Sequence, residues 1–371
     1  MKIYFIWSKD IIGSKNRAFY KRIEYLSKIH DVSLLVRKMA VIEKDISKYV
    51  RILRCPYEIY WPARLLSWLM KRSGKISNPV GYLMFTFWCF RLIRKELPLK
   101  TLGVVYTFQN LDAFVGYLSA KLGYTWVVDL LDMPDLYVEK IKNREKLRYI
   151  VLAWLRNIIF YRVLRMHKIF KEASKVFFIG YNKADYFGQR LIREYGIKPN
   201  KLCPVPNGVD LALCKRSGRI SINDKKFRLL YVGSVSAERG IQILLEAVQQ
   251  IKERIPHVQL ILVGSVSRHF NNKLCKEIDQ RNIKNEVKVL GQMSHQKVLE
   301  MIELADICLY PFLKTKVLDG VIPIKVLEYL ALNKVVIASD LSGIRGIIRH
   351  CYNGILVPPG DAARLRDAVY T

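Results

Sequence analysis

One stretch of this sequence, residues 320–343, constrains the fold more than any other part of the chain. Gly320 and Pro323 form a turn before an apolar helix predicted for residues 324–332, and the apolar run of residues 335–338 follows this helix. A helix that leads directly into a buried strand is half of a βαβ unit, in which parallel strands alternate with helices. The stretch therefore predicts an α/β fold with a parallel sheet.

The same alternation of strand and helix runs through the rest of the chain. Buried strands and amphipathic helices are predicted at 2–7, 17–29, 32–36, 103–107, 112–122, 125–131, 176–179 and 182–195, and again at 228–232, 241–252, 258–263, 287–290, 295–304 and 306–310. The two series predict two doubly wound α/β domains. A chain of 371 residues, of which 51% are apolar, is long enough to build two such cores.

The boundary between the two domains is predicted at residue 206. Residues 198–227 show little periodicity and are rich in Pro, Asn, Gly and Lys, with PVPNGVD at their centre. We therefore expect a first domain of residues 1–205 and a second domain of residues 206–371.

A charged pair lies at the start of the helix predicted for residues 324–332. Lys325 falls in the first turn, where the helix dipole favours an anion, and Glu328 follows three residues later on the same face. The helix start and these two side chains could bind a diphosphate and, beyond it, a sugar diol. The alternative is an ordinary exposed Lys–Glu pair, which contributes roughly 0.2–0.5 kcal/mol. This stretch alone favours the alternative.

A second candidate anion site is the loop GSVSAERG, residues 233–240, which precedes the helix predicted for residues 241–252. Its backbone amides form an anion-binding helix start, and Arg239 lies at its mouth. The next two predicted strands each end at a glycine, Gly264 and Gly291. These loops all follow the carboxyl ends of strands, where open α/β sheets bind their ligands.

Acidic residues mark the corresponding edge of the first domain. The strand predicted for residues 125–131 leads into DLLDMPD, so Asp129 and Asp132 are candidate site residues, although Asp132 is equally suited to cap the next helix. The loop after the first strand contains Gly13 but lacks the three glycines of a dinucleotide fingerprint, which argues against an NAD site.

The cysteines and the N-terminus predict a cytosolic protein. The seven cysteines are scattered and form no CxxC motif, which favours reduced thiols, and no metal-ligand spacing is present. The apolar run at the N-terminus is too short for a signal peptide or a spanning helix.

The net charge of +30 is concentrated in the first domain. Residues 1–206 hold 38 Lys and Arg against 16 Asp and Glu, and the remainder holds 24 against 16. Such an excess predicts a polyanionic partner, which could be nucleic acid, an anionic membrane surface or a phosphorylated substrate.

Two segments of the first domain favour the membrane among these partners. Residues 57–97 interleave three tryptophans with basic residues, and residues 144–173 form a long basic amphipathic stretch with Trp154, Ile158 and Phe160 on its apolar face. For residues 57–97 alone, an unusually aromatic internal helix is an equally good explanation. No recognisable nucleic-acid module accompanies the charge, so no nucleic-acid partner is expected.

Five motifs together give a more specific resemblance. They are PVPNGVD, LLYVGSVSAERGI, VQLILVG, PIKVLEYLALNKVVIASDLSG and NGILVPPGD, in this order. Over residues 207–361 this pattern resembles the donor-binding domain of family 4 retaining glycosyltransferases, which have the GT-B fold of two Rossmann-like domains facing a cleft. The resemblance is weaker over the first domain, where the order of elements is consistent with it. In that family the last helix crosses back to the first domain, so the final helix is expected to be truncated at residue 371.

The resemblance implies roles for individual residues. Arg239 and Lys325 match the cations that contact the donor diphosphate, and Glu328 matches the glutamate that binds the ribose diol. The remaining donor-side positions are the loop and turn residues Gly233, Ser234, Gly264, Gly291 and Pro323. Gly13, Asp129 and Asp132 would lie on the acceptor side. A nucleotide-diphosphate sugar would be the donor substrate, with no other cofactor and no metal.

The sequence departs from the family pattern at three places. Ser234 stands where the family often has an arginine, and Gly320 stands where it usually has a second glutamate. The neighbouring Asp319 could replace that glutamate as a contact to the donor sugar. Leu131 stands between Asp129 and Asp132 where the family often has a histidine.

Three functional hypotheses follow. The first is a retaining glycosyltransferase, peripheral on the cytoplasmic face of the cell membrane, that transfers a sugar to a lipid-linked or saccharide acceptor. The second is a catalytically decayed protein of the same fold that acts as a membrane-tethered binding or partner subunit. The third is a sugar-nucleotide epimerase, which ranks last because few candidate acids and no well-placed histidine are found.

Overall fold

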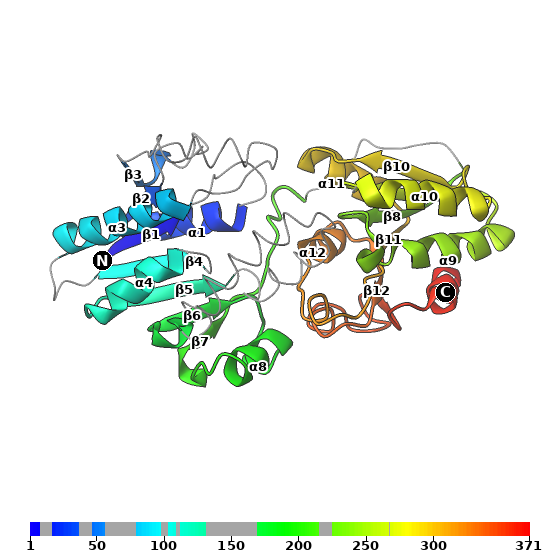
Figure 1. Ribbon diagram of the computed structural model, residues 1–371. Helices are drawn as coiled ribbons and strands as arrows, with labels where there is room; N and C mark the ends of the chain where they lie inside the picture. The colour runs from blue at the N-terminus through cyan, green and yellow to red at the C-terminus, as the bar shows by residue number, and fades with distance from the viewer. Residues whose placement is uncertain are drawn as a thin grey trace. The chain divides into compact units, whose positions relative to one another are not determined.

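The protein divides into two compact units, Met1–Val205 and Pro206–Thr371. This division falls inside the turn-rich PVPNGVD segment. The computed structural model shown in Figure 1 describes residues 1–7, 17–36, 47–55, 79–97, 103–108, 112–130, 169–214, 225–266 and 268–371. Each unit is an α/β domain built on its own sheet.

The described part of the first unit is organised around a parallel sheet of seven strands, in the order β3-β2-β1-β4-β5-β6-β7. The strands are β1 (Lys2–Trp7), β2 (Asp31–Val36), β3 (Arg51–Arg54), β4 (Gly103–Phe108), β5 (Thr125–Leu130), β6 (Lys175–Phe178) and β7 (Leu202–Pro204). The helices are α1 (Arg17–Ser27), α3 (Pro79–Glu96), α4 (Asp112–Lys121) and α8 (Tyr186–Arg193), with 3₁₀ turns at Phe170–Glu172 and Pro199–Lys201.

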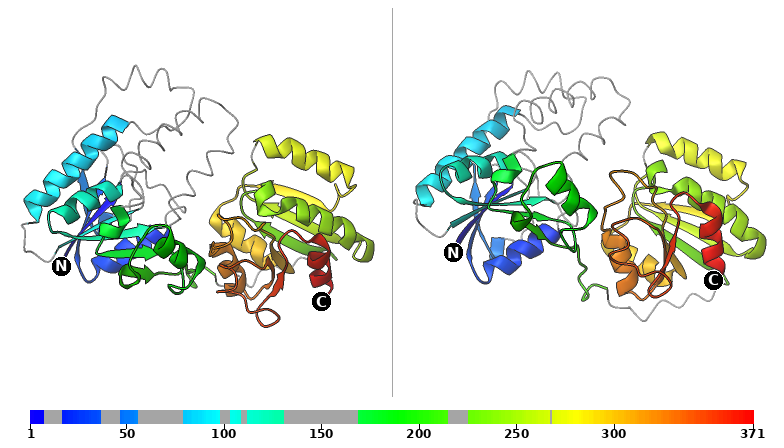
Figure 2. Two further views of the ribbon diagram at one scale, coloured as in Figure 1. Left: turned by 60° about the horizontal axis from the view of Figure 1, so that its bottom comes forward. Right: turned by 90° about the horizontal axis from the view of Figure 1, so that it is seen from below.

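Alternate residues of β1 face opposite sides of this sheet. Ile3 and Phe5 pack in one core with Ile23 of α1, whereas Tyr4 and Ile6 pack in another with residues of α3 such as Phe85. Both faces of the sheet are therefore covered, which is the condition for the near-continuous apolar strands of a parallel sheet. Figure 2 shows α1 and α3 on opposite sides of the strands.

Two strands of the first unit are not among the predicted elements, and one predicted helix begins later than expected. The unpredicted strands are β3, with sequence RILR, and β7, with sequence LCP, and neither is a continuous apolar run. The helix predicted for residues 182–195 begins later, at Tyr186. The Asp185 carboxylate accepts hydrogen bonds from the backbone N–H groups of Tyr181 and Asn182, so the preceding residues form a turn.

The two basic aromatic segments are described only in part. Residues 79–96 form α3, whereas residues 57–78 lie outside the described residues. Of the amphipathic stretch predicted for residues 144–173, the structure describes residues 169–173, which include a 3₁₀ turn.

The described part of the second unit has a parallel sheet of six strands, in the order β10-β9-β8-β11-β12-β13. The strands are β8 (Phe227–Val232), β9 (Val258–Val263), β10 (Val287–Gly291), β11 (Ile307–Tyr310), β12 (Val335–Ser339) and β13 (Ile355–Val357). The helices are α9 (Ile241–Arg254), α10 (Arg268–Gln280), α11 (His295–Leu304), α12 (Ile324–Ala331) and α13 (Ala362–Tyr370), with a 3₁₀ turn at Ala237–Arg239.

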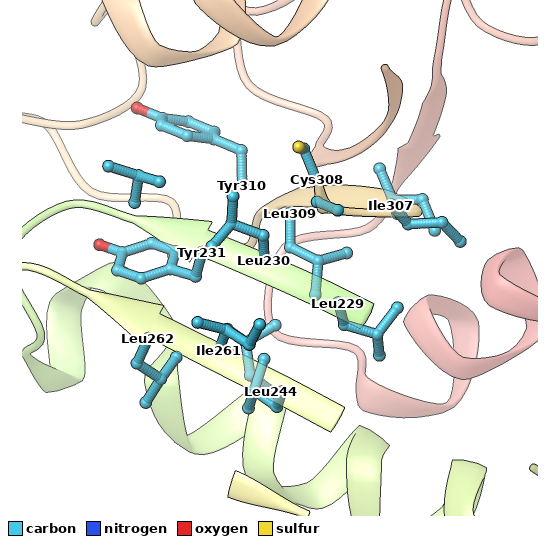
Figure 3. Close-up of a cluster of buried hydrophobic side chains, with 14 of the residues drawn as sticks. Leu229, Leu230, Tyr231, Leu244, Ile261, Leu262, Ile307, Cys308, Leu309 and Tyr310 are labelled. Atoms are coloured by element: carbon cyan, nitrogen blue, oxygen red, sulfur yellow. The ribbon is translucent and has the colours of Figure 1, made fainter. Parts of the chain in front are cut away.

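The core of the second unit is centred on β8, β9 and β11. Figure 3 shows leucine, isoleucine and tyrosine side chains of these three strands packed together with Leu244 of α9. Helices cover both faces of the sheet, and Figure 2 shows α12 on the opposite side from α9 and α13. α10 is not among the predicted elements, although Phe270, Leu274 and Ile278 recur every four residues, which is a helical spacing.

The helix predicted for residues 324–332 forms close to its predicted position. α12 ends at Ala331, one residue before the predicted end, and Pro323 is its N-cap residue rather than its first helical residue. The extended backbone of Pro323, with φ −83° and ψ 125°, turns the chain into the helix. The β11–α12–β12 unit predicted from residues 320–343 is thus present, with β11 and β12 parallel.

Two glycines at the carboxyl edge of this sheet provide a test of the packing. A Cβ at Gly264 would lie 1.8 Å from the backbone oxygen of Gly233, and its φ of +144° disfavours other residues. A Cβ at Gly291 would meet no atom within 4 Å, although its φ is +70°. Of these two glycines, Gly264 alone combines a positive φ with a backbone clash.

We expect Gly264→Ala to lower the free energy of unfolding by about 3 kcal/mol, because neither backbone can move away without breaking the core. Gly291→Ala should cost about 1 kcal/mol, which is the penalty for the left-handed conformation alone. Urea unfolding of the two variants measures the difference. Equal losses would contradict the close contact between the loops at Gly264 and Gly233.

Candidate functional site

The predicted donor-side residues meet at one edge of the second sheet. Gly233 follows β8, Gly264 follows β9 and Gly291 ends β10. Arg239 lies in the loop after β8, and Lys325 and Glu328 lie on α12, which follows β11. All of these positions are at the carboxyl ends of parallel strands, where ligands of open α/β sheets bind.

Glycines allow the loops at this edge to approach one another. The Gly264 N–H donates to the carbonyl of Gly291 at 2.8 Å. Gly240 lies against the backbone of Pro311, with φ +71° and only 1.8 Å between an added Cβ and the Pro311 oxygen. No side chain would fit between these segments, so the loops after β8, β9 and β11 pack backbone to backbone.

The glycine loop differs from the prediction in where its amides point. The N–H groups of Gly233 and Val235 donate to carbonyls of the β9 loop, at 2.9 Å each. Those of Arg239 and Gly240 donate to carbonyls within the loop itself. Four of the amides expected to face an anion are thus used inside the protein.

The Arg239 guanidinium is half-buried and lies over an aromatic ring. Its Cζ is 4.2 Å from the centroid of Phe312, and the Phe312 ring stacks on Tyr310 at 3.8 Å. A cation held against a ring face gains about 0.5–1 kcal/mol or more and loses rotational freedom. Arg239 is therefore positioned at the carboxyl edge of the sheet without an ion-pair partner being required to hold it.

Two tyrosine hydroxyls lie close to this arginine and differ in their partners. Figure 3 shows the hydroxyls of Tyr231 and Tyr310 toward the carboxyl ends of β8 and β11. The Tyr231 hydroxyl donates to the carbonyl oxygen of Ser234 at 2.8 Å, which fixes that loop residue. The Tyr310 hydroxyl is buried and has no hydrogen-bond partner within the described structure. Burial raises the pKa of both phenols, so both remain neutral.

The centre of the candidate site is Glu328. Its side chain is 6% exposed, and each carboxylate oxygen has a partner: Oε1 lies 2.8 Å from Nε2 of His295, and Oε2 lies 2.6 Å from Nζ of Lys325. The exposed Lys–Glu pair considered as the alternative is therefore not what the structure shows. Glu328 is instead a buried carboxylate held between two nitrogen groups, an arrangement that fixes its position.

His295 is a site residue that the sequence analysis does not include. It is the first residue of α11 and lies 33 positions before Glu328, so no local pattern connects the two. The available signal is its place just after the carboxyl end of β10, beside the other donor-side loops.

Two further residues position α12. The Tyr329 hydroxyl, on the fully buried Tyr329 side chain, accepts a hydrogen bond from the backbone N–H of Val232 at 3.0 Å. Asn207, from the PVPNGVD motif, donates to the carbonyl of Ile322 at 2.7 Å, just before the helix begins. These contacts tie the helix to the end of β8 and to the start of the unit.

Asp319 is directed into the protein. The residue is 7% exposed, and its two carboxylate oxygens accept from the backbone N–H and the hydroxyl of Ser342, at 3.1 and 2.9 Å. Its own carbonyl accepts from the N–H of Gly343 at 2.8 Å. The carboxylate is therefore engaged in holding the loop after β12 against the turn before α12.

Of the predicted acceptor-side residues, only Asp129 can be placed. Its carboxylate is 1% exposed, accepts from the Tyr106 hydroxyl at 2.5 Å and pairs with Arg22 of α1. This network joins α1 to β4 and β5 inside the first unit. Gly13 and Asp132 lie outside the described residues.

Among the residues that the structure describes, no group of three or more His, Cys, Asp and Glu side chains is arranged to hold a metal ion. The polar groups at the edge of the second sheet are instead two cations, Arg239 and Lys325, and one carboxylate, Glu328.

Comparison with known proteins finds similarities that lie mainly in the second unit. Residues 215–370 match the family model of glycosyl transferases group 1. The chain is 28% identical over 151 residues to alpha-D-kanosaminyltransferase of Streptomyces kanamyceticus, covering 41% of this chain and 37% of that protein. It is 23% identical over 245 residues to N,N'-diacetylbacillosaminyl-diphospho-undecaprenol alpha-1,3-N-acetylgalactosaminyltransferase of Campylobacter jejuni, covering 60% of this chain and 57% of that one. The chain thus spans less than two thirds of the length of each of these relatives.

The fold extends the likeness over the whole chain. The structure of HepE from Anabaena in complex with UDP has a TM-score of 0.65 and 16% sequence identity, and the match covers 100% of this chain and 89% of that one. The predicted GT-B architecture of two Rossmann-like domains is confirmed, and residues 215–370 of the second unit are similar to glycosyl transferases group 1.

Two buried tyrosines of the second unit, Tyr310 and Tyr329, give a matched pair of variants. Tyr329→Phe leaves the buried N–H of Val232 without its acceptor, which should lower the free energy of unfolding by about 1–3 kcal/mol. Tyr310→Phe removes a hydroxyl that has no partner in the described structure, so it should leave stability unchanged or raise it. Urea unfolding measures both variants. Equal losses of stability in Tyr310→Phe and Tyr329→Phe would contradict the stabilising role assigned to the hydrogen bond between Tyr329 and Val232.

Proposed function

We propose that this chain, with its group 1 domain at residues 215–370, is a retaining glycosyltransferase of family 4 that uses a nucleotide-diphosphate sugar. The observation that carries the proposal is the buried Glu328 carboxylate, held beside Lys325 at the sheet edge that also contains Arg239. A carboxylate can accept two hydrogen bonds from a ribose diol, and the two cations can bind the diphosphate.

The chemistry assigned to these residues is charge stabilisation. As the glycosidic bond to the diphosphate breaks, negative charge collects on the leaving group and the sugar approaches an oxocarbenium ion. Arg239 and Lys325 stabilise the leaving diphosphate, while Glu328 fixes the nucleoside and takes no part in proton transfer. Two side-chain cations supply the charge that a metal supplies in other phosphate sites, so we propose no metal.

Asp319 contributes through the loop after β12. Its carboxylate is bonded to Ser342, so a direct contact with the donor sugar would require it to release that residue. We assign Asp319 a positioning role for the turn before α12. A contact with the donor sugar, as the resemblance implies, stays a second hypothesis for this residue.

The first unit is proposed to bind the acceptor at an anionic membrane surface on the cytoplasmic side. The named activity of the Campylobacter jejuni relative involves a diphospho-undecaprenol, which supports a lipid-linked acceptor here.

Within the described residues, no helix is both long and apolar enough to span a bilayer. α3 offers a surface contact instead, because Phe87, Arg91, Arg94 and Lys95 are exposed and recur at helical spacing on one face. The phenyl ring can enter the headgroup region and the three cations can bind anionic lipid.

A second candidate function is a binding protein with a decayed sugar site. The observation that favours it is the absence of a free carboxylate at the turn before α12, where Gly320 has no side chain and the Asp319 carboxylate is bonded to Ser342. Such a protein would still bind nucleotide or membrane, but it would transfer no sugar.

Nucleotide binding tests the donor site. We expect one nucleoside diphosphate among UDP, GDP and ADP, together with its sugar derivatives, to raise the melting temperature, since a ligand present at 100 times its dissociation constant stabilises the folded state by about 2.7 kcal/mol. Glu328→Gln, which preserves the size of the side chain, should weaken binding by about 10-fold because it loses a charged acceptor for the ribose.

Glu246→Gln, an exposed position on α9, is the matched control and should bind nucleotide as the wild type does. The absence of stabilisation by every nucleotide would overturn the donor assignment. Nucleotide binding without sugar transfer to any lipid-linked acceptor would favour the binding protein.

Vesicle binding tests the membrane surface. We expect the protein to bind vesicles containing phosphatidylglycerol and to lose this binding as salt is raised, because the attraction is screened. Substituting Arg91, Arg94 and Lys95 with glutamine should weaken binding by about 100-fold, since each cation near an anionic surface contributes about 1 kcal/mol.

The control replaces three exposed cations elsewhere in the first unit, Lys183, Arg193 and Lys198, with glutamine. It makes the same change in net charge. Equal losses in the two triple variants would show that overall charge, and not the face of α3, is responsible.

A further inference from the structure

We propose that His295 is a positioning residue for the donor: it holds Glu328 in place while Lys325 exchanges this carboxylate for the donor diphosphate. The inference rests on the proposed function and adds a residue to it. Its starting observation is that His295 and Lys325 occupy different oxygens of the same buried carboxylate, Oε1 and Oε2.

A diphosphate at the start of α12 competes with Glu328 for Lys325, because both anions attract the same ammonium group. Nζ of Lys325 lies 2.6 Å from Oε2 of Glu328. The lysine side chain is 31% exposed and has a flexible four-carbon stem, so its ammonium group can move toward an anion at the start of α12. This movement frees Oε2 of Glu328 at the time when the donor brings a ribose diol.

The position of His295 is fixed by the helix on which it lies. His295 begins α11, whose N-cap Ser294 accepts a hydrogen bond from the N–H of Lys297 at 3.4 Å. Val298, Leu299 and Ile302 of the same helix are buried in the core of the unit. An imidazole has only two side-chain torsions, so its Nε2 is fixed relative to the sheet far better than the lysine ammonium is.

When Lys325 releases Glu328, the buried carboxylate still needs a hydrogen-bond partner, and His295 supplies it. A carboxylate that is 6% exposed is costly to leave without a hydrogen bond, and removing one partner of a buried pair destabilises it strongly. With His295 present, Oε1 remains bonded as Lys325 leaves, and the diol hydroxyls take its place on Oε2. His295 therefore acts through Glu328, and its effect should depend on the ribose hydroxyls.

Calorimetric titration of the full chain tests this role. The probes are UDP or whichever nucleoside diphosphate stabilises the wild type, the 2′-deoxy form of that nucleotide, and inorganic pyrophosphate. We expect His295→Ala to weaken binding of the ribonucleotide by about 10-fold, the loss of one charged hydrogen bond. It should change binding of the deoxynucleotide much less and that of pyrophosphate not at all.

His295→Gln supplies a side-chain N–H donor and should restore most of the affinity. Lys325→Met gives the contrasting pattern, because it should weaken binding of the ribonucleotide, the deoxynucleotide and pyrophosphate alike. If His295→Ala does not fold, His295→Phe takes its place, since it keeps an aromatic ring and lacks the nitrogen.

The outcomes separate this inference from the proposed function. Wild-type binding with no loss in His295→Ala, or an equal loss for all three probes, overturns the role of His295 and leaves the donor site standing. No binding of any nucleotide to the wild type overturns both.

Discussion

The arrangement of the candidate site depends on one buried hydrogen bond, between the hydroxyl of Tyr329 and the backbone N–H of Val232. The N–H belongs to the last residue of β8, at the start of the glycine loop, and the hydroxyl comes from the middle of α12. The bond therefore sets the distance between the loop that contains Arg239 and the helix that contains Lys325 and Glu328. Both groups can act on one ligand only if this distance is constant, and a buried bond to backbone is a contact that solvent does not compete for.

The rest of the site follows a common plan, in which polar groups not aimed at the ligand are paired within the protein. Four amides of the glycine loop bond to neighbouring carbonyls, and the Asp319 carboxylate bonds to Ser342. Arg239 is held by the face of the Phe312 ring, a contact that leaves the charge of the guanidinium in place. The Tyr310 hydroxyl departs from this plan, since it is buried beside this arginine without a hydrogen-bond partner in the described structure.

The sequence predicted best the features that depend on residues close together in the chain. Continuous apolar runs predicted the central strands of both sheets, and the three-residue spacing of Lys325 and Glu328 predicted their contact, because both follow from the geometry of one element. β3 and β7 were missed because neither is a continuous apolar run: β3 is RILR and β7 is LCP. His295 was missed for a different reason: its contact with Glu328 joins two helices that only the folded sheet brings together. The internal bonding of the loop amides likewise depends on how closely β8 and β9 approach.

The close backbone contacts among the loops have a consequence for how this domain can diverge. Gly264 and Gly240 admit no side chain, because the backbone oxygens of Gly233 and Pro311 occupy the space. Insertions or larger residues at these positions would separate the loops after β8, β9 and β11 from one another. If the proposed donor site is correct, changes in donor preference are expected from side chains at this edge, such as Ser234 and His295. The loop backbone stays fixed, and single side-chain substitutions can alter ligand selectivity without changing it.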